Sequence, residues 1–162
     1  MPTLHARKEA EDFKQIAPAA CTAIMALGKA IEESGLNKQL LELVKIRASQ
    51  INGCAFCAQL HLNIARMHDV PQEKLDLVAV WRDAGIFSDD ERAALAWTEI
   101  LTDGVRQGIS DAAYAAVLEQ FSETELAHLT AAVGHINLWN RIAVAFRFSP
   151  LIPQRAATGR VA

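Results

Sequence analysis

Two cysteines and a histidine stand at helical spacing near the middle of the chain, in the segment CAFCAQLH that runs from Cys54 to His61. Residues three and four positions apart share one face of an α-helix, so Cys54, Cys57 and His61 are expected to point in the same direction. The dipeptide Asn52-Gly53 directly before them signals a helix end or turn, and it predicts that Cys54 lies in the first turn of a new helix. Unpaired N–H groups and the helix dipole at that end stabilise a thiolate.

This spacing supplies the parts of a redox-active dithiol: a sulfur that can be activated, a second sulfur within bonding distance, and a base one turn away. The helix dipole alone would make Cys54 the nucleophile. Two other interpretations stay open. Cys54, Cys57 and His61 could bind a metal ion with His68 or Glu42 as the fourth ligand, although structural zinc sites usually bring a second pair of cysteines. Alternatively, the cysteines and the histidine are ordinary core residues.

Glu42 belongs to the helix predicted before this segment. A single glutamate in a helix usually faces solvent, but the neighbours of Glu42 are apolar: leucines at positions 40, 41 and 43, and Val44. We therefore expect Glu42 to be partly buried. Burial beside a thiol and an imidazole raises the pKa of a carboxyl group, and such a group can pass protons.

Together, Glu42, Cys54, Cys57 and His61 resemble the E-x11-C-x-x-C-x-x-x-H signature of the AhpD-like alkylhydroperoxidases, which belong to the carboxymuconolactone decarboxylase superfamily. Four further segments resemble the small peroxidase-related branch of that superfamily: IRASQINGCAFC at 46–57, WR at 81–82, ERAALAWT at 91–98 and NLWNR at 137–141. The resemblance extends over about residues 15–150.

The resemblance implies a thiol-dependent peroxidase that reduces organic hydroperoxides through a cysteine sulfenic acid and an intramolecular disulfide. It implies that Cys57 attacks the peroxide, that Cys54 resolves the sulfenic acid, and that Glu42 and His61 relay protons to the thiols. It also implies helices that pack between subunits of a homo-oligomer, a trimer or hexamer. An external dithiol of the lipoyl or thioredoxin type would reduce the disulfide, and neither a cofactor nor a metal is expected.

One position departs from the family pattern. The best-known members carry a histidine directly before the second cysteine, where this chain has Phe56. One member of the proton relay is therefore missing. Two other functions stay open: a redox sensor or non-peroxidase disulfide oxidoreductase, and a decarboxylase-type enzyme of the same superfamily. Decarboxylase members generally lack the pair of cysteines that this chain has.

Length and composition place the chain among globular proteins. Its 162 residues suit a single AhpD-like domain over 1–162 with a core at about 15–150. Hydrophobic residues make up 51% of the chain and charged residues 22%, a composition unlike that of disordered proteins. A net charge of −3 argues against nucleic-acid binding, and no apolar run is long enough for a membrane span. The first residues lack the apolar region of a secretory signal, and three cysteines do not make a disulfide framework. We therefore expect a cytoplasmic protein.

The fold class expected from the sequence is all-α, with six or seven helices, because alanine and other strong helix formers dominate and alternating strand patterns are missing. Asn37 is a good N-cap, and Ser88 with Glu91 and Ser122 with Glu125 have capping-box spacing. The expected helices are 18–34, 38–51, 54–67, 71–84, 88–105, one that begins at 110, and 122–146.

Five further features complete the predictions. Cys21 stands in an apolar run and is expected in the core. His128 and His135 share a face of the last helix, but two histidines alone seldom make a metal site. Arg141 is a charged residue in the otherwise apolar last helix, and it is expected to pair with an acid, line the pocket or contact another subunit. Gly134 in the same helix is expected to mark a close approach between helices. The polar tail 153–162 is expected to be mobile or held by a neighbour.

Overall fold

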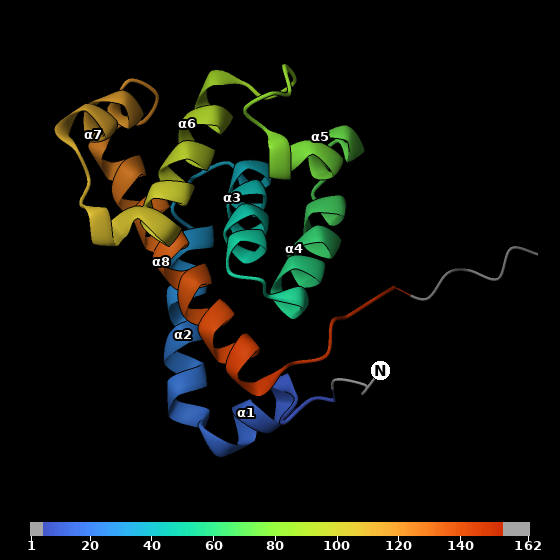
Figure 1. Ribbon diagram of the computed structural model, residues 1–162. Coiled ribbons are helices and arrows are strands. Elements are labelled where there is room, and N and C mark those ends of the chain that lie inside the picture. Colours follow the sequence, from blue (N-terminus) through green and yellow to red (C-terminus); the bar gives the residue numbers. More distant parts are fainter. Residues whose placement is uncertain (1–4, 154–162) are drawn as a thin grey trace, which may run out of the picture.

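The computed structural model describes residues 5–153, and over this range the chain forms α-helices and no β-strand (Figure 1). The predicted all-α fold is confirmed. Almost the whole polar tail lies outside the described residues, so its expected behaviour stays a prediction. Eight α-helices follow one another over 5–153: α1 (Ala10–Ile16), α2 (Pro18–Glu32), α3 (Lys38–Ile51), α4 (Ala55–Met67), α5 (Gln72–Leu77), α6 (Asp89–Glu99), α7 (Asp111–Leu118) and α8 (Glu123–Phe146).

The predicted caps start three of these helices. The side chain of Asn37 accepts hydrogen bonds from the backbone N–H groups at positions 39 and 40, ahead of α3. Capping boxes form between Ser88 and Glu91 before α6, and between Ser122 and Glu125 before α8. These local contacts satisfy N–H groups that have no partner inside the helix, so short-range sequence signals place the helix starts well.

Three elements differ from the prediction. Helix α1 was not expected, because its N-cap is Glu9 rather than Ser, Thr, Asp or Asn, and only Phe13 of its residues is buried. The expected helix 88–105 ends as an α-helix at Glu99 and continues as a π-helix, η2 (Ile100–Gly104), and a 3₁₀ turn, η3 (Val105–Gln107). Helix α5 likewise ends early in a 3₁₀ turn, η1 (Val78–Val80), where β-branched residues weaken the helix.

Helix α3 occupies the centre of the molecule and packs against α4, α6 and α8 (Figure 1). Its apolar side chains join two core clusters, one with α6 and α8 and one with α4 and η1. Because α3 is covered on almost every side, three of its polar residues are buried as well: Glu42, Lys45 and Ser49. Buried polar groups need partners, and these partners organise the site described below.

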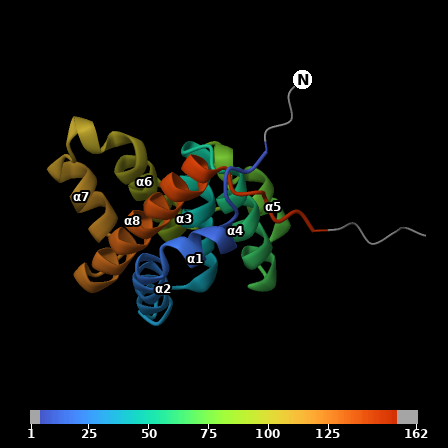
Figure 2. The same ribbon diagram turned by 90° about the horizontal axis from the view of Figure 1, so that it is seen from below.

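The first two helices lie beside the C-terminal half of α8 (Figures 1 and 2). The backbone N–H of Arg7 donates to the carbonyl of Phe146, and Ser149 donates to the side chain of Glu9. Phe13 on α1 packs edge-on against Trp139, with ring centroids 6.1 Å apart. These contacts hold α1 against the start of α4, where the two cysteines lie.

The expected close helix approach at Gly134 is wrong, because no atom lies within 4 Å of the position that a Cβ would take there. The close approach is at Gly28 instead, where an added Cβ would lie 3.0 Å from Cε1 of His135. None of the helices in residues 5–153 has both the length and the hydrophobicity of a membrane span.

Candidate active site

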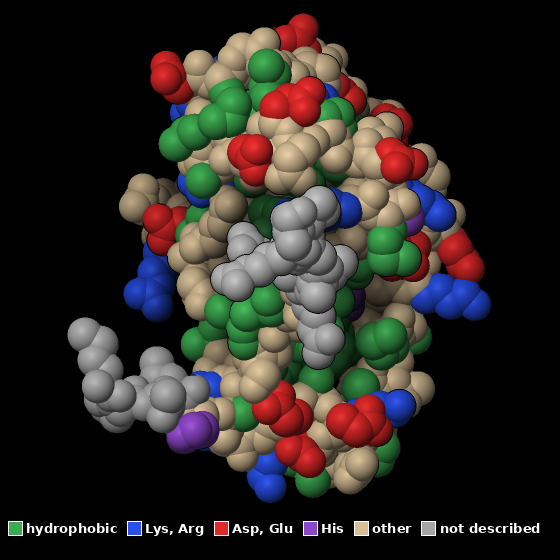
Figure 3. Space-filling model, turned by 90° about the vertical axis from the view of Figure 1, so that its right-hand side faces the viewer, with side chains coloured by type: hydrophobic (Ala, Val, Ile, Leu, Met, Phe, Trp, Pro, Cys, Tyr) green, Lys and Arg blue, Asp and Glu red, His purple; other side chains and the backbone are tan. Residues whose placement is uncertain are grey.

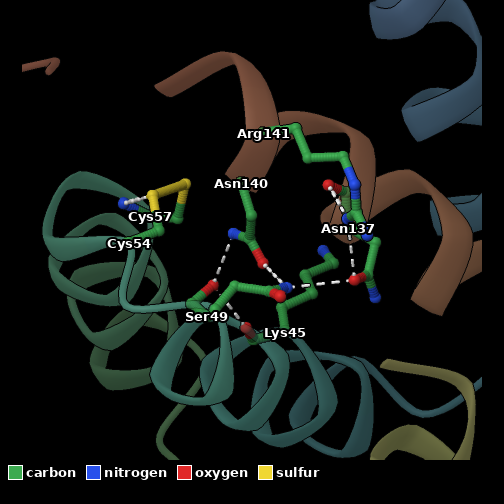
Figure 4. The surroundings of a disulfide bond; sticks show 8 residues. Lys45, Ser49, Cys54, Cys57, Asn137, Asn140 and Arg141 are labelled. Atoms are coloured by element: carbon green, nitrogen blue, oxygen red, sulfur yellow. Dashed lines mark hydrogen bonds between the residues drawn. A yellow bond between two sulfur atoms is a disulfide. The ribbon is translucent and has the colours of Figure 1, made fainter. Parts of the chain in front are cut away.

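The two cysteines form a disulfide at the N-terminal end of α4 (Figure 4). Cys54 is the N-cap residue, one position outside the predicted first turn, and its Sγ accepts a hydrogen bond from the N–H of Cys57 at 3.2 Å. Their Cα atoms are 5.4 Å apart, and both side chains are buried. The two sulfurs are therefore within bonding distance, as the spacing predicted, and the described state is the oxidised one.

Glu42 is hydrogen-bonded to two basic side chains, one on α4 and one on α3. Its Oε2 accepts a hydrogen bond from Nδ1 of His61 at 2.8 Å, and its Oε1 accepts one from Nζ of Lys45 at 2.7 Å. Glu42 is 3% exposed and Lys45 is 7% exposed. The expected burial of Glu42 and its contact with His61 are present. Lys45 was missed, although its spacing of three residues from Glu42 on one helix was a signal for the pair.

The pKa of Glu42 lies below its ordinary value, so the expected upward shift is wrong. Burial is the largest single influence and would raise the pKa, but the hydrogen bond and charge of His61, with the charge and hydrogen bond of Lys45, together outweigh it. Glu42 is therefore ionised at neutral pH. Because an ionised carboxylate only accepts hydrogen bonds, His61 must carry its proton on Nδ1, and a neutral ring then presents the lone pair of Nε2.

A cavity of about 410 Å³ adjoins the dithiol. Cys57 and His61 line it from α4, Lys45 lines it from α3, and His135 lines it from α8, whereas Cys54 does not line it. Most of the remaining lining is apolar: Met25, Ile31, Phe56, Leu60, Ile64, Ile136, Trp139 and Phe148. Figure 3 shows hydrophobic side chains gathered along the hollowed middle of one face of the molecule, with acidic side chains above and below them. Of the two sulfurs, only that of Cys57 is placed to meet a small apolar molecule in the cavity.

The sequence profile of the carboxymuconolactone decarboxylase family matches residues 18–99, which include all four predicted site residues. YdfG of Bacillus subtilis, an uncharacterized protein, is 33% identical over 133 residues, which are 82% of this chain and 90% of that protein. The chain belongs to the carboxymuconolactone decarboxylase family. The expected family membership is thus confirmed at the level of sequence.

Solved structures agree with this assignment. A protein of unknown function from Agrobacterium tumefaciens, suggested to be the antioxidant defence protein AhpD, is 36% identical with a TM-score of 0.86, over 92% of this chain and all of that one. The debrominase Bmp8 shares the fold at 19% identity with a TM-score of 0.74, over 82% of this chain and 72% of its own. This carboxymuconolactone decarboxylase family member therefore has an AhpD-like fold, on which more than one chemistry occurs.

An amide network ties the end of α3 to α8 next to the disulfide (Figure 4). The Nδ2 of Asn52 donates to Oδ1 of Asn140 at 2.8 Å and to Oδ1 of Asn137 at 3.0 Å. Asn140 in turn donates to Oγ of Ser49 at 3.1 Å and is 1% exposed. Because Asn52 and Gly53 lead directly into Cys54, this network fixes the backbone that carries the dithiol.

Replacing Asn140 with alanine is expected to destabilise this family member by about 1–3 kcal/mol, since Ser49 and Asn52 each lose a buried partner. Urea unfolding of the reduced protein measures the change. Asn63→Ala is the matched control, because that asparagine lies away from the network, donates to the carbonyl of Leu151 at the surface and accepts from the side chain of Gln59 on its own helix. It should change stability by no more than about 0.5 kcal/mol. Equal losses in the two variants would contradict the role given to the network.

A second prediction concerns acid stability. A carboxyl group whose pKa is lower in the folded than in the unfolded state adds stability above its unfolded pKa, near 4.5 for Glu42, and that stability is lost as the pH falls through the folded value. The stability difference between the wild type and Glu42→Gln should therefore be largest near neutral pH and shrink as the pH falls below about 4.5. Urea unfolding over this pH range tests it, and parallel curves for the two proteins would refute it.

The remaining residues for which the sequence predicted a role lie in different parts of the structure. The candidate metal ligands do not converge, because no group of three His, Cys, Asp or Glu side chains in residues 5–153 is placed to hold one ion. Arg141 donates to the backbone and side chain of Asn137, not to an acid, and lines a second cavity between η2 and α8. His128 bonds a backbone carbonyl at the surface. Cys21, expected in the core, is half-buried and lines the first cavity.

Proposed function

We propose that the protein is a thiol-dependent peroxidase that reduces organic hydroperoxides through a Cys54–Cys57 dithiol/disulfide cycle. The observation that carries this proposal is that Cys57 lines a largely apolar cavity together with His61, whose ring is hydrogen-bonded to the buried Glu42. The similarity to the Agrobacterium tumefaciens structure, which is suggested to be the antioxidant defence protein AhpD, supports this proposal. An apolar lining suits a hydroperoxide with an organic group better than hydrogen peroxide, which has no apolar part.

The first step of the proposed reaction forms the thiolate. In the reduced protein, the thiol of Cys57 passes its proton to Nε2 of His61, directly or through a water. Glu42 holds His61 in the tautomer that can accept this proton, and its negative charge stabilises the imidazolium that results. Lys45 keeps Glu42 ionised, so that the carboxylate does not take the proton itself.

The second step transfers two electrons from sulfur to peroxide. The Cys57 thiolate attacks the terminal oxygen of the hydroperoxide, the O–O bond breaks, and an alkoxide leaves and takes the proton from His61. Cys57 is then a sulfenic acid. Cys54 then loses its thiol proton and attacks this sulfur, the S–O bond breaks, the hydroxide takes up that proton and leaves as water, and the disulfide forms.

An external dithiol closes the cycle by thiol–disulfide exchange and is itself oxidised to a disulfide. We propose a lipoyl- or thioredoxin-type donor, a homo-oligomer as the working form, and a cytoplasmic setting, because a reducing compartment supplies such donors. Phe56, in place of the usual histidine, packs edge-on against Phe148 with ring centroids 5.3 Å apart, so it adds apolar surface where other members have a proton carrier.

The test is a single turnover. Reduced protein is mixed with cumene hydroperoxide, and the Cys54–Cys57 disulfide and cumyl alcohol are quantified by mass spectrometry and chromatography. One equivalent of alcohol per disulfide is expected within minutes, and none from a Cys54→Ser/Cys57→Ser variant that retains Cys21. Absence of both products in the wild type would overturn the proposal. Stoichiometric oxidation that neither lipoyl nor thioredoxin donors reverse would instead identify a redox sensor.

A further inference from the structure

A second histidine, His135 on α8, lines the cavity that Cys57 and His61 line from α4. No chemical role was predicted for this histidine. It is half-buried, and the glycine at position 28 of α2 leaves the space in which its ring lies, since a Cβ there would approach Cε1 to 3.0 Å and Nε2 to 3.3 Å. Glycine inside a helix destabilises it by about 0.5–1 kcal/mol relative to alanine, so this space has a conformational cost.

The hydrogen bonds of His135 involve one ring nitrogen only. Its Nε2 lies 3.0 Å from the carbonyl oxygen of Ile24, which accepts, and 3.2 Å from Nε1 of Trp139, which donates. A neutral imidazole nitrogen either donates or accepts, so each tautomer serves one of these neighbours. When Nε2 accepts from Trp139, the ring proton is on Nδ1. The carbonyl of Ile24 then keeps the backbone N–H partner that it has inside α2.

The other ring nitrogen is free for a ligand. Nδ1 of His135 makes no hydrogen bond with any residue of the range 5–153, and no polar side-chain atom there is both buried and without a partner. Nδ1 is therefore accessible. Burial lowers the pKa of His135, and the charge of Lys45 and that of a protonated His61 lower it further, against the hydrogen bond that a protonated His135 would donate to the carbonyl of Ile24 and the charge of Glu32. The ring is accordingly neutral at pH 7.

These positions give the cavity complementary polar groups. His61 supplies an acceptor from α4, at Nε2, and His135 supplies a donor from α8, at Nδ1. A hydroperoxide matches this pair, because its O–H is a donor and its second oxygen is an acceptor. The charged residues of the lining are Lys45, which is paired with Glu42, and four exposed side chains, Glu11, Lys14, Lys29 and Glu32; the rest of the lining is mainly apolar.

Resting on the proposed peroxidase function, we infer that His135 is a second catalytic histidine, whose Nδ1–H donates a hydrogen bond to the peroxide oxygen that leaves as the alkoxide. The electron balance is that of the peroxidase step: Cys57 sulfur is oxidised to the sulfenic acid and the O–O bond is reduced. His135 keeps its own proton, and the alkoxide takes the proton that Cys57 passed to His61. The donor acts by stabilising the negative charge that develops on the oxygen.

Three substitutions separate this role from a structural one. Asparagine places an amide near the position of Nδ1, glutamine places one near Nε2, and phenylalanine removes both groups. If His135 acts on the peroxide, the rate constant of His135→Asn with cumene hydroperoxide should lie within about threefold of the wild-type value. The rate constants of His135→Gln and His135→Phe should be about tenfold lower, which corresponds to the loss of one hydrogen bond in the transition state. His128→Gln, about two turns away on the same helix and outside the cavity lining, is the matched control and should react like the wild type.

A second measurement reports the reactivity of the Cys57 thiolate separately from the reduction of peroxide. The rate at which iodoacetamide alkylates Cys57 should be unchanged in all the variants, because that reaction involves no leaving alkoxide. Wild-type rates in His135→Gln and His135→Phe, rescue by glutamine rather than asparagine, or a parallel loss of alkylation would each overturn the role of His135 while the peroxidase proposal stands. If the wild type itself forms no disulfide with peroxide, the proposed function fails and this inference fails with it.

Discussion

Replacing Cys57 with serine is expected to abolish the reaction with organic hydroperoxides, whereas replacing Cys54 with serine should leave that reaction intact and stop the cycle at the sulfenic acid. The reason is access: Cys57 lines the cavity and Cys54 does not, although both sulfurs belong to one disulfide. The peroxide must reach the attacking sulfur, so the reaction of Cys57→Ser with organic hydroperoxides should fall below the detection limit.

The experiment uses the Cys21→Ser background, because Cys21 lines the same cavity and could otherwise resolve the sulfenic acid. Each variant is treated with cumene hydroperoxide in the presence of dimedone, which labels sulfenic acids, and the labelled residue is located by mass spectrometry. Label on Cys57 in the Cys54→Ser variant, and no label in the Cys57→Ser variant, is the expected result. The reverse pattern would make Cys54 the nucleophile, as the helix dipole alone suggests.

Replacing Glu42 with glutamine is expected to slow the oxidation of Cys57 by about a hundredfold, the lower range for loss of general base catalysis. The amide keeps the size of the side chain but removes the charge that holds His61 in its tautomer and stabilises the imidazolium. It also leaves the buried Lys45 without its counterion. Loss of this counterion should lower the stability of the fold as well as slow the formation of the thiolate.

The measurement is the second-order rate constant for disulfide formation with cumene hydroperoxide, together with the alkylation rate of Cys57 as a function of pH. Glu91→Gln is a matched control, because Glu91 is a buried glutamate that is paired with Lys74 at 2.7 Å and does not line the cavity. Equal slowing in both variants would show that the effect of Glu42→Gln is only a general loss of stability. An unchanged rate in Glu42→Gln would remove Glu42 from the mechanism.

The dithiol was predictable because its geometry is local. Cys54 and Cys57 are held within one helical turn, so their spacing alone brings the sulfurs into bonding distance. The same holds for the caps of α3, α6 and α8, whose partners are at most three residues apart. The contact of Glu42 with His61 crosses two helices, and it was predicted from the resemblance to a family rather than from the spacing.

The pairing of Lys45 with Glu42 had a local signal in their spacing of three residues, but the burial of that pair, the pKa of Glu42 and the role of His135 could not be predicted in this way. The expected direction of the pKa shift of Glu42 was wrong because the prediction considered burial and left out the charge of Lys45. Lys45 acts on Glu42 because both side chains of α3 turn toward the same buried space. His135 reaches the cavity because α8 crosses α2 at the one place where a glycine leaves room for a ring. Such contacts depend on how helices cross.

From the order of its residues alone, this chain determined its helical character, the starts of most helices and the pairing of two sulfurs, because these follow from interactions over one or two helical turns. Only the tertiary structure decided which of the two cysteines lines the cavity, which charges surround Glu42 and which histidine of α8 lines the same cavity. Those outcomes depend on side chains from α2, α3, α4 and α8 that meet in one space, and packing between distant segments has no short-range signature in a sequence.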